Sequence, residues 1–234
     1  IYLKPYLVMF TTLPKKILLL LFIFALNAGL LNSLTLITFF HQPVTHMTGN
    51  VSLLATDLYF ASYSHLIFLI FVIIAFMMGT ILSGFILGTS DFKLEANYGY
   101  LLSVELTCVI CCLISTMLDL SSLVIIFATL SAGIQNSLLS SYKGINIRTT
   151  HLTGVFTDLG LAIGLKLRRV NVPIQRFTLN LAILAGFITG CLLSIPLLKY
   201  LSHLAFIGPT ILILFLCSSY WFKFFSHSTD QTNK

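Results

Sequence analysis

Charged residues are scarce in this chain. Only 9% of its 234 residues are Asp, Glu, Lys or Arg, whereas a soluble domain carries about 25%. Hydrophobic residues make up 57%, and the mean hydropathy is +0.99. So few charges cannot cover the surface of a water-soluble fold, and several apolar runs reach the roughly 20 residues that a helix needs to cross a bilayer. The composition predicts an all-α integral membrane protein and excludes a soluble fold.

Acidic residues are the rarer charged type, with 7 Asp and Glu against 13 Lys and Arg and a formal net charge of +6. The basic residues stand at the ends of apolar runs, which is where membrane proteins carry the charges that set their orientation. The surplus of positive charge therefore does not indicate a nucleic-acid partner.

Enzyme motifs are also lacking. The sequence has no Gly-x-Ser-x-Gly, no His-Glu-x-x-His and no phosphate-binding loop, and no metal ligands stand at a standard spacing. Three of the five cysteines form a Cys-x-x-Cys-Cys run at 108–112, which we interpret as small apolar packing residues. We expect no enzymatic activity, no catalytic residues, no metal and no cofactor.

The apolar runs divide the chain into eight segments. Six are long and are predicted to span a membrane, at about 17–40, 65–89, 97–118, 121–140, 177–199 and 203–225. Two are shorter and more polar, at 44–62 and 149–167. We expect residues 1–16 to lie at the membrane interface, 17–118 and 119–225 to form two repeated halves, and 226–234 to be a disordered polar tail.

The division into halves rests on two recurring motifs. Thr45-His46-Met47-Thr48-Gly49 is echoed by Thr150-His151-Leu152-Thr153-Gly154, and the stretch 28–34 is echoed by 132–138. The two echoes stand at offsets of 105 and 104 residues. Both motifs keep their order, and the spacing between them differs by one residue, so the sequence predicts an internal repeat in which each half contains a long segment, a short polar segment and two more long segments.

The short segments decide the topology. Two full crossings would give eight spans and parallel halves, whereas two segments that dip in and return would give six spans and inverted halves. Basic residues divide nine inside to four outside for eight spans and twelve to one for six, which favours six. The stretch after Arg148 is roughly 28 Å long as a helix, close to the hydrocarbon thickness of about 30 Å, and a dip would draw Arg148 inward at a cost of at least about 2.5 kcal/mol. We expect eight crossings, with both termini cytoplasmic.

Polar residues inside these segments are candidates for a substrate or proton pathway: Asn32, His46, Thr48, Asn50, Asp57, Glu105, Asn136, His151, Thr153 and Asp158. His46 with Asp57, and His151 with Asp158, share one face of a helix by their spacing. An acid surrounded by lipid is costly, so it should face a cavity or a partner. Asp158, near the middle of its segment, is predicted to carry protons. The alternatives are acids bound to neighbouring helices, histidines that face interfacial water, and Thr and Gly rows that pack helices.

The motifs also carry a family resemblance. The Ala-Gly-x-x-Asn-Ser and Thr-His-Met-Thr-Gly-Asn runs, followed by Gly-Ile-Gln-Asn-Ser and Thr-x-Leu-Thr-Gly-x-x-Thr-Asp-Leu, resemble the YoaK-like family of small bacterial membrane proteins. The resemblance runs from about Asn27 to about Leu216 and implies a multi-pass inner-membrane protein, without a substrate or catalytic residues. Members often carry an acid near the position of Asn32, so a protonatable group there is not essential in this chain.

Repeated halves with polar residues at membrane depth are typical of secondary transporters. We expect a small transporter or channel of unknown substrate, with His46, Asp57, Asn136, His151 and Asp158 converging on one cavity between the halves. The alternatives are a non-transporting structural or regulatory membrane partner and, third, an intramembrane enzyme. The expected partners are membrane lipid and an unknown small molecule or ion, with no nucleic acid, and a homo-oligomer is left open.

Overall fold

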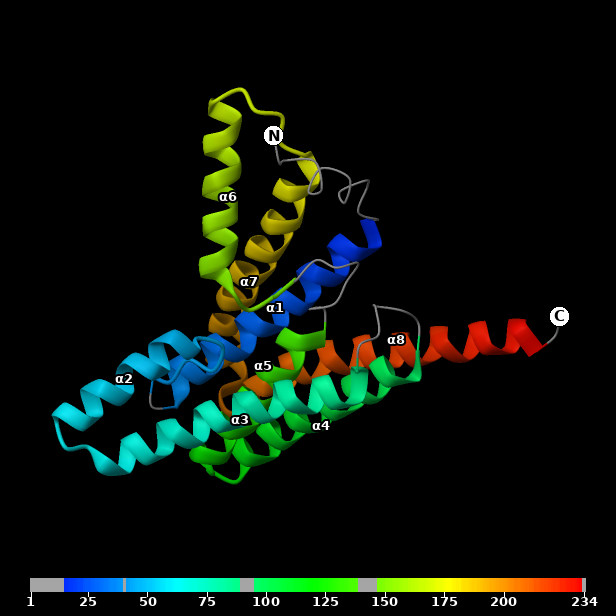
Figure 1. Cartoon of the computed structure of the whole chain (residues 1–234). Helices are drawn as coiled ribbons and strands as arrows, with labels where there is room; N and C mark the ends of the chain where they lie inside the picture. Colours follow the sequence, from blue (N-terminus) through cyan, green and yellow to red (C-terminus); the bar gives the residue numbers. More distant parts are fainter. Residues whose placement is uncertain (1–14, 40, 89–94, 139–146, 233–234) are drawn as a thin grey trace.

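The computed structural model describes residues 15–39, 41–88, 95–138 and 147–232, with side chains as far as residue 226. These residues form helices and their connections, without a strand in the described ranges (Figure 1). The helices are α1 (Lys15–Thr38), α2 (Met47–Tyr59), α3 (Tyr63–Leu87), α4 (Ala96–Met117), α5 (Ser121–Leu138), α6 (Leu152–Leu167), α7 (Ile174–Leu201), the 3₁₀ helix η1 (Ser202–Phe206) and α8 (Ile207–Thr232).

Each of the eight predicted segments overlaps one of these α-helices, but the predicted ends of the chain differ. The expected disordered tail at 226–234 is wrong for most of its length, because α8 continues as a helix to Thr232. The expected interfacial segment 1–16 lies outside the described residues except for Lys15 and Lys16, which begin α1.

Five helical stretches are long and apolar enough to cross a membrane by length and composition. They are α1, α3, α4, α5 and the run Ile174–Ser226, which contains α7, η1 and α8. The φ angle of 47° at Ser202 interrupts this last run between α7 and α8. By contrast α2 has 13 residues and α6 has 16, or about 20 and 24 Å, which is shorter than a hydrocarbon layer of about 30 Å. The chain has the build of a helical membrane protein, and α2 and α6 do not reach the length of its other helices.

Glycines set the closest helix contacts. A Cβ atom at Gly186 or Gly190 of α7 would collide with the carbonyl oxygen of Phe22 or Leu26 in α1. Between α3 and α5, a Cβ at Gly79 or Gly133 would meet the facing backbone in the same way. Small residues let helix backbones approach closely in membranes, where van der Waals contact replaces the hydrophobic effect as a driving force. The pairs α1–α7 and α3–α5 therefore form the packed centre of the fold.

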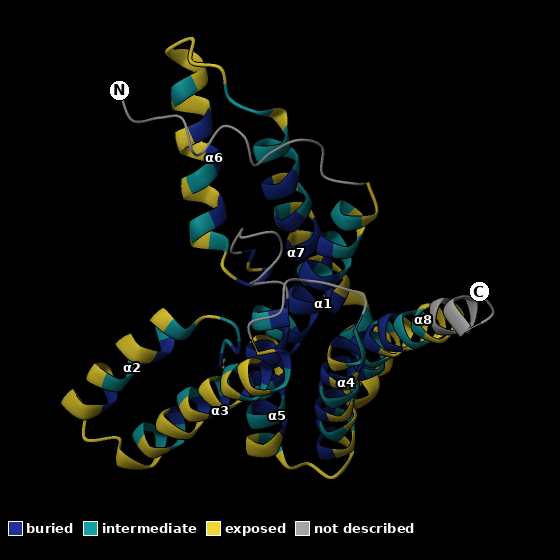
Figure 2. Cartoon of the chain, turned by 45° about the vertical axis from the view of Figure 1, so that its right-hand side comes forward, coloured by how far each residue is buried: buried dark blue, intermediate teal, exposed yellow. Residues whose placement is uncertain are grey.

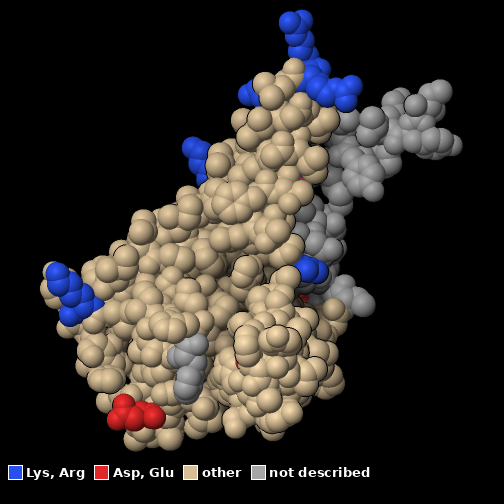
Figure 3. Space-filling view, turned by 90° about the vertical axis from the view of Figure 1, so that its left-hand side faces the viewer, with Lys and Arg blue, Asp and Glu red and all other residues tan. Residues whose placement is uncertain are grey.

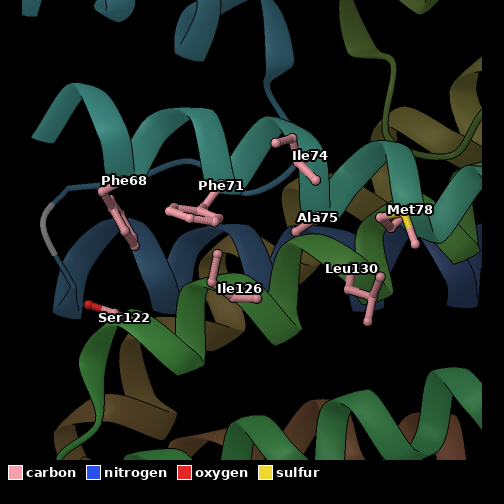
Figure 4. Close-up of a pocket in the computed structure, with 8 residues that line it drawn as sticks. All are labelled: Phe68, Phe71, Ile74, Ala75, Met78, Ser122, Ile126 and Leu130. Atoms are coloured by element: carbon pink, nitrogen blue, oxygen red, sulfur yellow. The ribbon is translucent and has the colours of Figure 1, made fainter.

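The order of contacts gives the direction of each helix pair. Contacts advance together along α1 and α7, since Gly186 meets Phe22 and Gly190 meets Leu26, so these helices run parallel. Figure 4 shows the same order along α3 and α5. By contrast α4 runs antiparallel to α8, because Ser103 meets Cys217 whereas the earlier Gly99 meets Trp221. The α4–α8 direction becomes important for the topology below.

Burial follows this packing. Figure 2 shows buried residues gathered where α1, α4, α5 and α7 pass one another, and exposed residues over much of α2 and α6. Many of the exposed side chains are large and apolar, such as Phe85 at 86% exposed and Leu167 at 80%. An outer surface of this kind is suited to contact with lipid tails.

Candidate functional site

Just before each of the short helices α2 and α6, a threonine is hydrogen-bonded to an asparagine of the preceding helix. The hydroxyl of Thr45 donates to Oδ1 of Asn32 at 2.8 Å, and the backbone N–H of Thr45 donates to the same oxygen at 3.1 Å. The hydroxyl of Thr150 donates to Oδ1 of Asn136 at 2.7 Å. Asn32 stands about 9 Å before the end of α1, at 1.5 Å per residue. The chain therefore turns back after α1, and α2 starts well inside the end of that helix.

The first turns of α2 and α6 are left without side-chain caps. His46 and His151 precede the two helices, and neither side chain makes a capping hydrogen bond. Their rings instead lie beside Gly49 and Gly154. Uncapped N–H groups at a helix start can bind water, an anion or a polar ligand. His46, Thr48, His151 and Thr153 are all exposed at these two starts.

The side chain of Asn50 is hydrogen-bonded to the loop that precedes α2. Its side chain is fully buried, its Oδ1 accepts from Nε2 of Gln42 at 2.6 Å, and its Nδ2 donates to the carbonyl of Pro43 at 3.1 Å. These bonds fasten the loop between α1 and α2 onto the first turn of α2. Asn50 thus holds the site's backbone in place, and its polar atoms face the loop.

The two aspartates pair with side chains of the helix that follows each of them. Oδ2 of Asp57 is 2.7 Å from Nδ1 of His65 in α3, and Oδ1 of Asp158 is 3.0 Å from a guanidinium nitrogen of Arg176 in α7. Arg176 is in the first turn of α7, so Asp158 lies near the end of that helix. Asp158 is the seventh of the 16 residues of α6, near the middle of its segment as expected, and its role in carrying protons stays a prediction.

The predicted convergence on one cavity is also not found among the described residues. Figure 1 shows α2 and α6 leading away from the middle of the molecule in different directions. Each helix takes Asp57 or Asp158 with it to a pair with α3 or α7. Asn136 stays with Thr150 near the start of α6. His46 and Asp57 thus lie in one part of the structure, whereas Asn136, His151 and Asp158 lie in another.

We expect Asp158→Asn to insert and fold normally. The Asp158 side chain is 50% exposed, and an exposed ion pair of this kind contributes about 0–1 kcal/mol. The measurement is the thermal unfolding midpoint of purified protein in detergent, with Arg176→Gln as the matched variant for the same pair. Aggregation of both variants would contradict the peripheral placement of this pair.

A different group of polar residues occupies the interior. We call Asn27, Glu105, Thr129, Ser131 and Gln135 the central polar layer. Each of the five residues is at most 1% exposed. Nδ2 of Asn27 donates to Oε1 of Gln135 at 2.9 Å, and Nε2 of Gln135 donates to the carbonyl of Phe24. These bonds join α1 to α5 at the centre of the molecule.

Helix register places Glu105 in this layer. Cys112 of α4 donates to the carbonyl of Val124 in the antiparallel α5. Both helices rise by the same distance per residue. Glu105 is seven residues before Cys112 in α4, and Ser131 is seven residues after Val124 in α5, so Glu105 and Ser131 lie at the same level. Gln135 stands one helical turn beyond Ser131. Thr129, Ser131 and Gln135 thus span about 9 Å along α5, and Glu105 of α4 lies level with this span.

Several atoms of the layer have no hydrogen-bond partner among the described residues. They are both carboxyl oxygens of Glu105, Oδ1 of Asn27 and the hydroxyl oxygens of Thr129 and Ser131. A buried polar group left unpaired costs about 1–3 kcal/mol, and more if it is charged. Such groups in a native interior call for a proton, a water or a ligand to complete them. Sequence reasoning singled out Glu105, but small hydroxyl residues such as Thr129 and Ser131 are common in helix packing and gave no signal.

A model of the family described as protein of unknown function (DUF1275) matches residues 20–219. The chain belongs to the DUF1275 family. No curated protein and no solved structure matches the chain, so the YoaK-like resemblance stays a prediction. The matched residues include the starts of α2 and α6 and the whole central polar layer. Every candidate site residue of this DUF1275 protein thus lies inside the family region.

One groove of about 480 Å³ opens between α3 and α5 of the DUF1275 protein. Figure 4 shows that its lining is apolar, with Phe68, Phe71 and Met78 from α3 and Ile126 and Leu130 from α5, and that Ser122 stands at one end. Binding sites for polar ligands need converging polar groups, which this groove lacks. It is suited to an acyl chain of the bilayer, and it is separate from the central polar layer.

The charges of the DUF1275 protein mark one end of the helix bundle. Lys166, Arg168 and Arg169 are exposed where α6 turns into α7, and Figure 3 shows Lys and Arg gathered at this tip above a largely uncharged body. Lys15 and Lys16 begin α1, which runs parallel to α7. The starts of α1 and α7 thus share a basic end.

Proposed function

We propose that this DUF1275 protein is a small secondary transporter or channel of the inner membrane, with its pathway through the central polar layer. The observation that carries the proposal is the layer itself, which places five fully buried polar residues at mid-depth, several of them without partners. Polar groups inside a membrane are expensive and mark substrate or ion pathways. A small polar molecule or an ion would complete the amide and hydroxyl groups of the layer. The proposal includes no catalytic role.

The contacts support two repeated halves, α1–α4 and α5–α8, that exchange packing partners. The first helix of each half packs on the third helix of the other, as α1 on α7 and α5 on α3. The bond between Asn32 and Thr45 recurs between Asn136 and Thr150. Transporter sites lie at the interface of such repeats, and the central polar layer lies where α1 and α5 meet.

The directions of α4 and α8 support inverted halves. These two helices hold the same position in the two halves, and they run antiparallel to each other. Equivalent helices are antiparallel only if each half crosses the membrane an odd number of times. We therefore propose three crossings per half, six in all, with α2 and α6 entering from opposite sides and returning. This replaces the eight crossings expected from the sequence.

The orientation follows from charge. The basic end formed by the starts of α1 and α7 is the cytoplasmic end by the positive-inside rule. With six spans, both termini then lie in the cytoplasm. The opposite end carries the exposed aromatic residues Tyr59, Phe60 and Tyr63 at the turn from α2 to α3, which is the residue type enriched at a membrane–water interface.

The test of function is uptake into proteoliposomes. Purified protein is reconstituted and screened against radiolabelled small polar metabolites and monovalent ions, with protein-free liposomes as the baseline. We expect at least one solute to enter faster than the baseline, and Gln135→Leu to lower that uptake at least tenfold, because it removes the amide that joins α1 to α5.

Asn180→Leu is the matched control. Asn180 is also a buried amide in a long helix, but its Nδ2 donates to the carbonyl of Arg176 in its own helix at 2.9 Å. We expect this variant to transport normally, with gel filtration showing that both variants remain folded. Baseline uptake of every solute tested would count against a transporter and favour the second candidate, a non-transporting membrane partner. Equal uptake by both variants would remove the central polar layer from the pathway.

A further inference from the structure

We propose that Glu105 is the proton-binding site of this protein, and that it takes up and releases a proton inside the membrane. The inference rests on the proposed transporter function and adds the coupling ion to it. It moves the proton-carrying role from Asp158, which is paired with Arg176 near a helix end, to an acid that has no partner among the described residues.

The first support is position. Glu105 lies near the middle of α4, a 22-residue helix, and its side chain is fully buried. From Glu105 the ends of α4 are about 14 and 18 Å away, at 1.5 Å per residue. Neither end of the helix is close enough for the carboxyl group to reach water directly.

The second support is the charge of the surroundings. No cationic residue faces Glu105 from any described element that packs against α4. In α5, from Ser121 to Leu138, no residue is titratable. Among the side chains that the structure describes, the titratable groups of the other elements are His203 in η1, Cys217, Tyr220 and Lys223 in α8, and Tyr63 and His65 in α3, beside Glu95, Tyr98, Tyr100, Cys108, Cys111, Cys112 and Asp119 around and within α4 itself. Of these Cys108 and Cys112, one and two turns further along α4, lie on the same face as Glu105.

The cationic groups among these residues are remote from Glu105. Lys223 lies toward the end of α8 that packs near the start of α4, two residues beyond Trp221, the neighbour of Gly99. His203 is exposed, and His65 is bound to Asp57 in the first turn of α3. An ionised carboxylate in such a site would have neither a counter-charge nor a hydrogen-bond donor among the described residues, so this structure, which we take as the closed state of the layer, holds Glu105 as the neutral acid.

Coupling between proton movement and transport follows from the difference between the neutral acid and the carboxylate of Glu105. In the closed structure the proton stays on a carboxyl oxygen as an O–H group, and the residue is uncharged. Loss of that proton to water leaves a carboxylate, which is tolerated only when the layer opens and water or the hydroxyls of Thr129 and Ser131 can donate to it. Release of the proton therefore accompanies opening of the layer, and uptake accompanies closing.

A membrane-permeant carbodiimide tests the proton site directly in the full-length protein. Dicyclohexylcarbodiimide accepts the carboxyl proton on its nitrogen while the carboxyl oxygen bonds to its central carbon, and the adduct rearranges to a stable N-acylurea that mass spectrometry locates. We expect modification of Glu105 at neutral pH in native membranes, with Asp57 and Asp158 unmodified. A water-soluble carbodiimide is expected to leave Glu105 unmodified because the site is dry.

Two outcomes would overturn the assignment. One is labelling of Asp158 or Asp57 by the permeant reagent while Glu105 stays unlabelled. The other is equal labelling of Glu105 by the water-soluble reagent, which would place it in contact with bulk water. The experiment uses the wild-type protein, so it decides the question even if Glu105→Gln fails to fold.

The coupling itself is tested by transport driven by a pH gradient. We expect Glu105→Gln to abolish accumulation against a concentration gradient, and Glu105→Asp to restore part of the accumulation. Unchanged accumulation in Glu105→Gln would refute coupling through this residue. The two proposals fail separately: labelled Glu105 with no transported solute would remove the transporter, whereas transport with Glu105 unlabelled would remove the proton site.

Discussion

Replacement of Gly190 by leucine should abolish the folded protein, and replacement by alanine should weaken it measurably. Even the single methyl group of alanine would meet the carbonyl oxygen of Leu26 and the backbone of Leu30. These neighbours are backbone atoms of α1, which cannot rotate aside as a side chain can. Overpacking of this kind costs about 1–3 kcal/mol, and the larger leucine would separate α7 from α1 altogether.

Gly164 provides the matched control. It also lies inside a helix, yet a Cβ there would meet no atom within 4 Å. Gly164→Ala should leave the protein unchanged or raise its stability slightly, since alanine is favoured over glycine in helices by about 1 kcal/mol. The measurement is the yield of monodisperse protein on size exclusion, together with its thermal midpoint in detergent. Equal behaviour of the two alanine variants would contradict the close packing of α1 on α7.

Single cysteines at positions 61 and 169 should label from opposite sides of the membrane. Ala61 follows α2, and Arg169 follows α6, and both are exposed. With six spans and inverted halves, the turn at Ala61 lies outside and the turn at Arg169 lies in the cytoplasm. With eight spans both turns would lie in the cytoplasm, so labelling at position 61 from outside the cell distinguishes the two topologies.

The experiment uses a bulky maleimide on intact and on permeabilised cells. The background protein has its five native cysteines replaced, since Cys111 and Cys191 are only partly buried. We expect Ala61→Cys to react in intact cells and Arg169→Cys only after permeabilisation. A reaction at both positions only after permeabilisation would restore the eight-span topology and the parallel halves that go with it.

The sequence predicts the helices well because length and hydropathy are local properties. An apolar run such as 65–89 has no alternative in a membrane except a helix, and α3 covers nearly the same residues. The topology was harder, because two signals conflict. The basic residues favoured six spans, whereas the uncharged stretch after Arg148 is nearly long enough to cross. The 16 residues of α6 support the six-span proposal, since the chain before Leu152 forms the turn that brings Thr150 to Asn136.

The site was predictable only in part. Asp57, Glu105 and Asp158 were all candidates, and the sequence favoured Asp158 as the proton carrier because it stands near the middle of its segment. Their surroundings depend on which helices become neighbours: α3 brings His65 to Asp57 and α7 brings Arg176 to Asp158, whereas α5 brings no charge to Glu105. The acid that remains without a partner is identified by packing between distant segments, which one sequence does not encode in any local pattern.

The exchange of helix partners has a consequence for biosynthesis. The contacts that hold α1 come largely from α7, so a nascent chain lacks the main native partner of its first span until the ribosome has passed residue 190. Translocation machinery or a chaperone must therefore shelter α1 while most of the protein is made. Separately expressed segments 1–118 and 119–234 should each be degraded alone, yet should rescue each other when they are made in the same cell.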